Sequence, residues 1–187
     1  MFYAAVVMLF TLLAPSWLAP SCALAQPAAS AESSGVAQGS KIRAAVFDFE
    51  LIDTSLEGEK QGPKPAEQAR LALLSHALRE KLAASSLYES VDITPVEAEA
   101  RGENLQNCGD CDVKMARELG ADVAITGTVQ KVSNLILNIN LYIRDARTGR
   151  SIEAMSVDIR SNTDESWMHG LDWLVRNKLL AAPQDRR

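Results

Sequence analysis

The pair of cysteines with a spacing that suits chemistry lies in the pentapeptide N-C-G-D-C, residues 107–111. A C-x-x-C pair is a redox centre, half of a metal site or a structural disulfide. A redox pair needs a thiolate of low pKa, normally on a first cysteine at a helix N-terminus directly after a strand. Here the lead-in is E-N-L-Q-N, and Asp110 and Asp112 flank Cys111 with negative charge. These neighbours disfavour the thiolate.

A zinc site requires two further ligands beside the cysteines. The two histidines of the chain, His76 and His169, stand far apart and fall in different predicted helices. We therefore predict a disulfide between Cys108 and Cys111, formed in an oxidising compartment and closing a tight turn. By the chain-entropy relation it stabilises the fold by about 2 kcal/mol. Redox and metal chemistry remain the alternatives, and neither a metal nor a cofactor is predicted.

Acidic residues gather where the first predicted strand ends. Asp48 and Glu50 project from one side of that strand, and Asp53 follows in the next loop. Such carboxylates serve as general acid and base or as ligands of a hard cation. The run does not match the calcium-loop motif, and no Ser/His/Asp or Gly-rich phosphate signature accompanies it. We assign no catalytic residue and keep a cation site at these three residues as an alternative to plain solvation or capping.

The first residues form an apolar leader. The run is shorter than the roughly 20 residues that span a bilayer, and Ala23-Leu24-Ala25 fits a signal-peptidase motif, so residues 1–25 are predicted to be a signal peptide. No Lys or Arg precedes Lys41, so the usual basic start of a signal is missing. Acylation of Cys22 in a lipoprotein is the competing interpretation, although its lead-in fits poorly. Both interpretations predict export to the periplasm.

Three further segments follow the leader. Residues 26–40 are rich in Ala, Ser, Gly and Gln and predict a disordered linker, residues 41–181 suffice for one domain, and 182–187 form a tail. The net charge of −5 gives no electrostatic footprint for nucleic acid or an anionic membrane. No later apolar run is long enough for a transmembrane segment.

The first half of the domain alternates strand and helix. Residues 41–51 predict a central strand, a polar loop follows, and Pro65 suits the first turn of a helix. Residues 88–94 predict a second strand, so the order implies a right-handed parallel crossover. The helix carries one apolar stripe: Leu71, Leu74, Leu78 and Leu82.

The second half predicts short helices at 96–105 and 112–119, the latter ended by Gly120. A strand follows in which Gly127 indicates a bulge or close backbone approach. Two more strands, 135–145 and 151–160, meet at a turn where Gly149 suits positive φ, and a helix covers 162–180. The fold class is α/β (α+β): a single domain whose mixed sheet has a parallel βαβ start and an antiparallel three-strand meander, with helices packed on it.

Two sets of motifs resemble known domains. A-R-E-L-G-A-D-V-A-I-T-G-T-V, with a later R-D-A-R-T-G turn, resembles TolB amino-terminal-like domains and the curli-secretion lipoprotein group. The motifs F-D-F-E-L-I-D-T-S-L-E-G-E, C-x-x-C and V-S-N-L-I-L-N-I-N-L-Y resemble more closely a family of secreted bacterial proteins of unknown function. The resemblance implies an envelope-assembly or interaction role and brings no catalytic residue.

Side chains for a partner surface come from one strand and the last helix. In strand 135–145 an apolar row is predicted to face the core: Leu135, Leu137, Ile139, Leu141 and Ile143. The core face of the last helix is Trp167, Met168, Leu171, Leu174 and Val175. The opposite faces carry the predicted partner surface: Asn138, Asn140, Tyr142, Arg144, His169 and Trp173. An ordinary solvated sheet face, and a Trp173 covered by the linker or tail, are the alternatives.

Together these features predict a non-enzymatic periplasmic binding or accessory module that meets an envelope protein. The alternative is a thiol-redox or cation-binding periplasmic protein that uses Cys108 and Cys111, or Asp48 and Glu50. The sequence predicts neither the partner's identity nor the oligomeric state.

Overall fold

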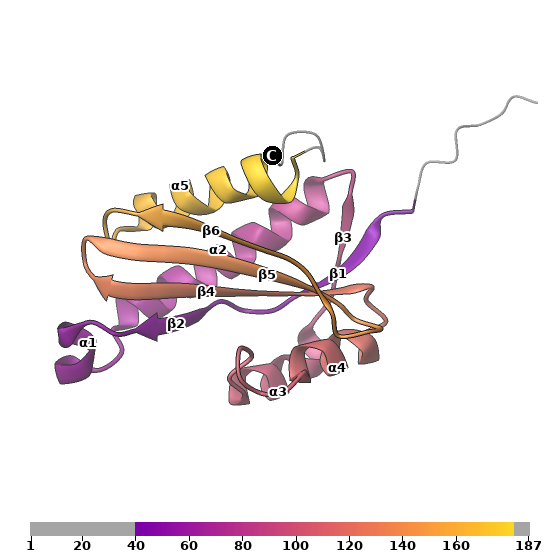
Figure 1. The fold of residues 1–187 in the computed structure, drawn as a ribbon, viewed down its shortest axis with the longest axis horizontal. Coiled ribbons are helices and arrows are strands. Elements are labelled where there is room, and N and C mark those ends of the chain that lie inside the picture. The colour runs from indigo at the N-terminus through magenta and orange to yellow at the C-terminus, as the bar shows by residue number, and fades with distance from the viewer. Residues whose placement is uncertain (1–39, 182–187) are drawn as a thin grey trace, which may run out of the picture. The chain divides into compact units, whose positions relative to one another are not determined.

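The structure is a computed structural model that describes residues 40–181 (Figure 1). The predictions of a signal peptide, of a linker up to residue 39 and of a tail from residue 182 lie outside the described residues. The elements follow in this order: β1 (Ile42–Val46), β2 (Glu50–Asp53), α1 (Leu56–Gln61), α2 (Pro65–Ala84), β3 (Tyr88–Val91), the 3₁₀ turn η1 (Thr94–Val96), α3 (Glu97–Gly102), α4 (Cys111–Glu118), β4 (Val123–Ser133), β5 (Ile136–Asp145), β6 (Ser151–Ile159), α5 (Asp164–Leu174) and the π-turn η2 (Val175–Leu179).

The strands form one mixed sheet in the order β3-β1-β4-β5-β6, with β2 also paired to β4. β1 is parallel to both β3 and β4, whereas β4, β5 and β6 form an antiparallel meander. Helices α2 and α5 cover one face of the sheet, and α3 and α4 lie against the other (Figure 1). The predicted fold class is confirmed, including the parallel start and the meander.

The first predicted strand is interrupted, which corrects the expectation of one strand over residues 41–51. Val46 pairs with Ile125 and Glu50 with Thr128, so residues 47–49 stand opposite residues 126–127 as a bulge. A hydrogen bond from the Phe49 amide to Ser75 Oγ, 2.9 Å long, holds the bulge to α2.

The bulge explains Gly127. A Cβ on this residue would lie 2.6 Å from Cδ1 of the buried Phe49 ring, so only glycine fits beneath the ring. The predicted close approach at Gly127 is confirmed.

A short helix, α1, replaces the polar loop expected after β2. The Ser55 side chain caps it by accepting a hydrogen bond from the Gly58 amide, 3.0 Å long. Acidic residues in its first turn, Glu57 and Glu59, suit the positive end of the helix dipole.

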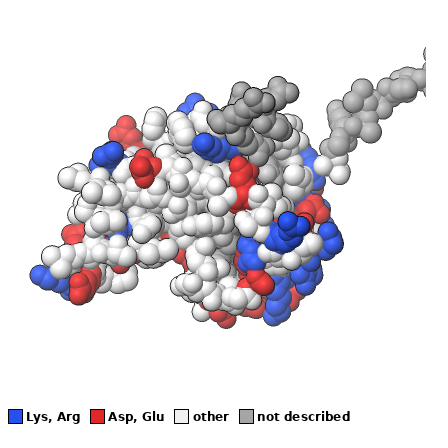
Figure 2. Space-filling view, in the orientation of Figure 1, with Lys and Arg blue, Asp and Glu red and all other residues white. Residues whose placement is uncertain are grey.

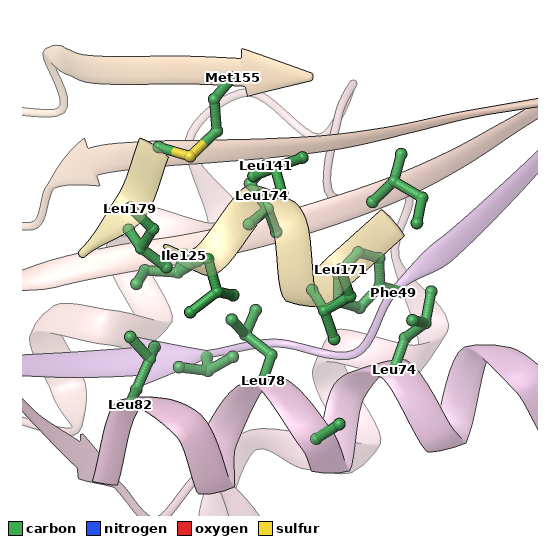
Figure 3. Packing of buried hydrophobic residues seen from close by; sticks show 14 of the residues in the cluster. Phe49, Leu74, Leu78, Leu82, Ile125, Leu141, Met155, Leu171, Leu174 and Leu179 are labelled. Carbon is green, nitrogen blue, oxygen red and sulfur yellow. The ribbon is translucent and has the colours of Figure 1, made fainter. Parts of the chain in front are cut away.

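The larger core cluster lies between the sheet and the pair α2 and α5 (Figure 3). The predicted leucine stripe of α2 is buried there, as is the predicted face of α5 except for Met168, which is half-buried. The apolar row of β5 is buried from Leu137 to Ile143. The prediction for Leu135 is wrong: this side chain is 69% exposed because it lies in the turn before β5 begins.

Candidate functional site

A cavity of about 460 Å³ lies at the carboxyl end of β1, between α2 and the η1–α3 segment. The chain leaves β1 through α2 on one face of the sheet and returns from β3 to β4 through α3 and α4 on the other. In open α/β sheets such a switch between faces is where ligands bind. We call this cavity the β2-edge pocket; it is lined by Asp48, Phe49, Glu50, Leu51, Gln68, Leu71, Ala72, Ser75, Ile93, Glu97, Ala100, Arg101, Glu103 and Leu105.

Asp48 stands at the rim of this pocket with its charge compensated. Its Oδ1 lies 2.6 Å from Arg79 Nη2, and its Oδ2 lies 3.4 Å from Arg101 Nε. Arg101 also reaches Glu97 on the same helical turn, at 2.6 Å. These ion pairs join the helices on both sides of the pocket through one carboxylate.

Glu50 lies deeper and has less support. The Leu105 amide donates to its Oε1 over 3.0 Å, but Oε2 is buried and has no hydrogen-bond partner within residues 40–181. Burial raises the pKa of Glu50 above its usual value, although Leu105 and Gln106 act in the opposite direction. Glu50 is therefore a carboxylate that the surrounding protein leaves partly uncompensated.

Asp53 belongs to a different place. Its Oδ2 lies 3.1 Å from Lys131 Nζ, and the Ser55 amide donates to its Oδ1 over 2.8 Å. Burial raises the pKa of Asp53, but the contacts with Ser55 and Lys131 outweigh it and lower the pKa below the usual value. The structure thus brings Asp48 and Glu50 to one pocket and separates Asp53 from them.

No cluster of three or more His, Cys, Asp or Glu side chains suited to a metal ion occurs in the described part of the chain. The cation site at Asp48, Glu50 and Asp53 stays a prediction, which thermal shift with divalent cations would test.

Cys108 and Cys111 lie at bonding distance, with Cα atoms 5.6 Å apart, a geometry compatible with the predicted disulfide. The intervening Asp110 has φ of 74° and precedes the first residue of α4. Arg144 holds this loop to the β5–β6 turn: it pairs with Asp112 at 2.8 Å, with the Asp110 carboxylate, and with the Gly149 carbonyl. Two acidic neighbours expected to repel a thiolate are thus bound by an arginine from a distant strand.

The other β5 residues of the predicted partner surface, Asn138, Asn140 and Tyr142, lie on the face of the sheet turned away from α2 and α5. Asn138 Nδ2 donates to Asp158 of β6 over 2.7 Å, and Asn140 Nδ2 donates to Thr128 of β4 over 3.3 Å. Tyr142 is half-buried beside them. Over β4, β5 and β6 the visible surface is mostly uncharged, while charges gather at α1 and around the β5–β6 turn (Figure 2).

Trp173 and His169 project from α5 toward the edge of the sheet. They line a cavity of about 590 Å³ between α5 and the outermost strand, β6. Trp173 is 39% exposed, although a tryptophan in a core would be covered. Asp158 of β6 contacts Asn138 and also lines this cavity. Strand β6 therefore lies between the polar row of β5 and the Trp173 cavity, which are the two parts of the predicted surface.

A family model for domains described as "Protein of unknown function (DUF2380)", DUF3280, matches residues 42–179. The chain belongs to this family. The match covers every strand and reaches the end of η2, so the DUF3280 region coincides with the described domain. No curated protein matches the chain.

Solved structures of similar fold include three bacterial proteins of low sequence identity. The LpoB C-terminal domain of Escherichia coli has a TM-score of 0.47 and 14% identity over 64% of this chain and 83% of that one. Lipoprotein GNA1162 of Neisseria meningitidis has a TM-score of 0.46 and 17% identity over 75% and 98%. TolB of Acinetobacter baumannii has a TM-score of 0.38 and 8% identity over 72% and 28%. The expected membership of a family of unknown function is confirmed, and a TolB structure is among those to which the chain is similar.

One charged cluster of this DUF3280 domain escaped the sequence interpretation. Lys131 is completely buried and lies within ion-pair distance of Asp53, Glu57 and Glu67. The alternation of β4 could have indicated this cluster, because Lys131 is two residues from Val129 and both side chains face the core. A lysine at such a position requires acidic partners.

Proposed function

We propose that this domain is a non-enzymatic binding or accessory module of the bacterial cell envelope, acting in the periplasm. The predicted leader and the disulfide-compatible cysteine pair support an exported protein. The fold is consistent with the role of a module, since Asp48 is held in ion pairs with Arg79 and Arg101 that join the helices around the pocket.

The observation that carries the proposal is Trp173 beside the outer edge of β6. Within residues 40–181 no strand pairs with that edge, and a cavity of about 590 Å³ runs between it and α5. A strand edge without a neighbouring strand among the described residues offers backbone donors and acceptors to an extended segment, and a tryptophan in an adjacent cavity gives that segment an anchor. The partner is an envelope protein that presents such a segment.

Capture from envelope extracts, followed by affinity measurement with the captured protein, tests the proposal. Trp173→Ala should weaken binding by more than about tenfold, which is the scale of an interface hot spot. Leu73→Ala is the matched control because Leu73 is 51% exposed on α2 and lies outside the cavity. Equal binding by both variants, or unfolding caused by Trp173→Ala, would reject this surface.

A further inference from the structure

The β2-edge pocket is separate from the surface around Trp173 and has features of a small-ligand site. Its volume of about 460 Å³ lies within the range of roughly 300–1,000 Å³ typical of such sites. Helix α2 supplies one wall, α3 and the residues that flank it supply the other, and the bulge between β1 and β2 forms the floor. The apolar lining consists of Phe49, Leu51, Leu71, Ala72, Ile93, Ala100 and Leu105.

The charges of the pocket are unbalanced. Its acidic lining residues are Asp48, Glu50, Glu97 and Glu103, against a single basic one, Arg101. Arg101 pairs with Asp48 and Glu97, and Arg79 supplies a second cation to Asp48. Glu50 and Glu103 remain without a cationic partner among the described residues, so the pocket attracts positive charge and repels anions.

The Oε2 atom of Glu50 adds a specific requirement. It is buried and accepts no hydrogen bond of ordinary geometry within the described chain, although Gln106 lies close enough to the carboxylate to lower its pKa; Oε1 accepts from the Leu105 amide. A buried acceptor without a donor costs free energy, and a charged donor restores the most. The partner that would stabilise this oxygen most is an N–H donor that carries positive charge.

We propose that the β2-edge pocket binds an organic cation: a primary ammonium or guanidinium group that donates to Glu50, attached to a short apolar chain that lies against the leucines of the pocket. The same chemistry occurs in free alkylamines and in the side chains of lysine and arginine.

Titration calorimetry of the full chain with three probes of equal length tests the charge requirement. Hexylammonium should bind, hexanol should bind at least tenfold more weakly, and hexanoate should give no measurable heat. Hexanol as strong as hexylammonium would reduce the pocket to an apolar hollow and overturn the proposal.

Two substitutions locate the site. Glu50→Gln should weaken hexylammonium binding at least tenfold, whereas Glu99→Gln should leave it unchanged because Glu99 lies on the same helix as Glu97 but outside the lining. Ala72→Trp places a large side chain from the exposed side of α2 into the pocket and should abolish binding without touching the core. Binding that survives both Glu50→Gln and Ala72→Trp would place the ligand elsewhere.

A second set of probes distinguishes the sources of the cation. Acetyl-lysine-amide and acetyl-arginine-amide, which are blocked at both backbone ends, are compared with hexylammonium. Tighter binding of a blocked amino acid assigns the pocket to a peptide side chain, and tighter binding of hexylammonium assigns it to a free amine. Trp173→Ala should leave all these affinities unchanged, so failure of the partner surface and failure of this pocket are separate results.

Discussion

The Nζ atom of Lys131 lies 2.7 Å from Oε1 of Glu67, and both side chains are almost completely buried. The pair joins the carboxyl end of the central strand β4 to the first turn of α2. Asp53 and Glu57 complete the lysine's contacts, and Asn162 Nδ2 donates to the same Glu67 oxygen over 2.7 Å. The cluster thus fixes β2, α1, α2 and the loop before α5 around one cation.

Removing Lys131 alone should destabilise the fold more than removing Lys131 and Glu67 together. Lys131→Met leaves Glu67 buried without a counter-charge and should lower the free energy of unfolding by about 3–5 kcal/mol. Lys131→Met combined with Glu67→Leu should recover most of that loss, because both completely buried charges are then gone and the remaining carboxylates, Asp53 and Glu57, are partly exposed. Urea unfolding of the two single variants and the double variant measures the coupling; a double variant less stable than Lys131→Met would contradict it.

The same cluster predicts loss of stability in acid. Contacts with Lys64, Asn134 and Lys131 lower the pKa of Glu57 from 4.5 to about 2, and the pKa of Asp53 is lowered as well. Between these pH values the unfolded chain binds more protons than the folded chain, so this stabilisation is present above pH 4.5 and disappears as the pH falls toward 2. Thermal unfolding across this window should show a decline that Glu57→Gln makes shallower. A Glu57→Gln profile as steep as that of the unchanged chain would contradict this assignment.

If the cysteine pair is a structural disulfide, Cys108→Ser should lower the free energy of unfolding by about 1–3 kcal/mol and leave the fold intact. Thiol trapping with mass spectrometry checks the alternative. Persistent oxidation within the chain supports the structural role, whereas cycling through mixed disulfides with another protein would support the redox one.

The sequence predicts those elements that are determined by residues close together in the chain. The leucine spacing of α2, the alternation of β5 and the glycine at 149 each carry their own periodicity or turn requirement, and the structure has them in place. The break between β1 and β2 depends instead on Ser75, which is distant in the sequence and holds the Phe49 amide. The ion pairs of Arg144 with Asp110 and Asp112 form only when the loop and the strand meet, so no local pattern in the sequence indicates them.

The β2-edge pocket likewise combines a local and a long-range contribution. Asp48 and Glu50 were selected from their position at a strand end, and the structure places both in one pocket. Its second wall comes from α3, about 50 residues further along the chain, and long-range packing of this kind has no periodic signal in the sequence.

Gly127 provides a test of the bulge. Gly127→Ala should lower the free energy of unfolding by about 1–3 kcal/mol, because the new methyl group overlaps the buried Phe49 ring. Gly102→Ala is the control, since no atom lies within 4 Å of its would-be Cβ. Adding Phe49→Leu to Gly127→Ala should recover part of the loss by removing the obstructing ring atoms. Equal effects of the two glycine substitutions would show that the ring does not define this site.

Glu50→Gln should make the domain more stable at neutral pH while it weakens cation binding. Burial raises the pKa of the Glu50 carboxyl, so between pH 4.5 and the raised pKa this group binds more protons in the folded state than in the unfolded state. Stability attributable to this group is therefore greatest in acid and falls as the pH rises through 4.5 toward the raised value. Glutamine keeps the shape and the hydrogen bond to the Leu105 amide but carries no charge, so the variant should lack this decline.

Thermal unfolding of Glu50→Gln and Glu99→Gln at pH 4 and pH 7 measures the effect. The difference in melting temperature between Glu50→Gln and the unchanged chain should be larger at pH 7, and the same difference for Glu99→Gln serves as the comparison. A residue that reduces stability and yet supports binding is the expected signature of a functional carboxylate. If Glu50→Gln is instead less stable at pH 7, the charge of Glu50 stabilises the fold and its role in the pocket is structural.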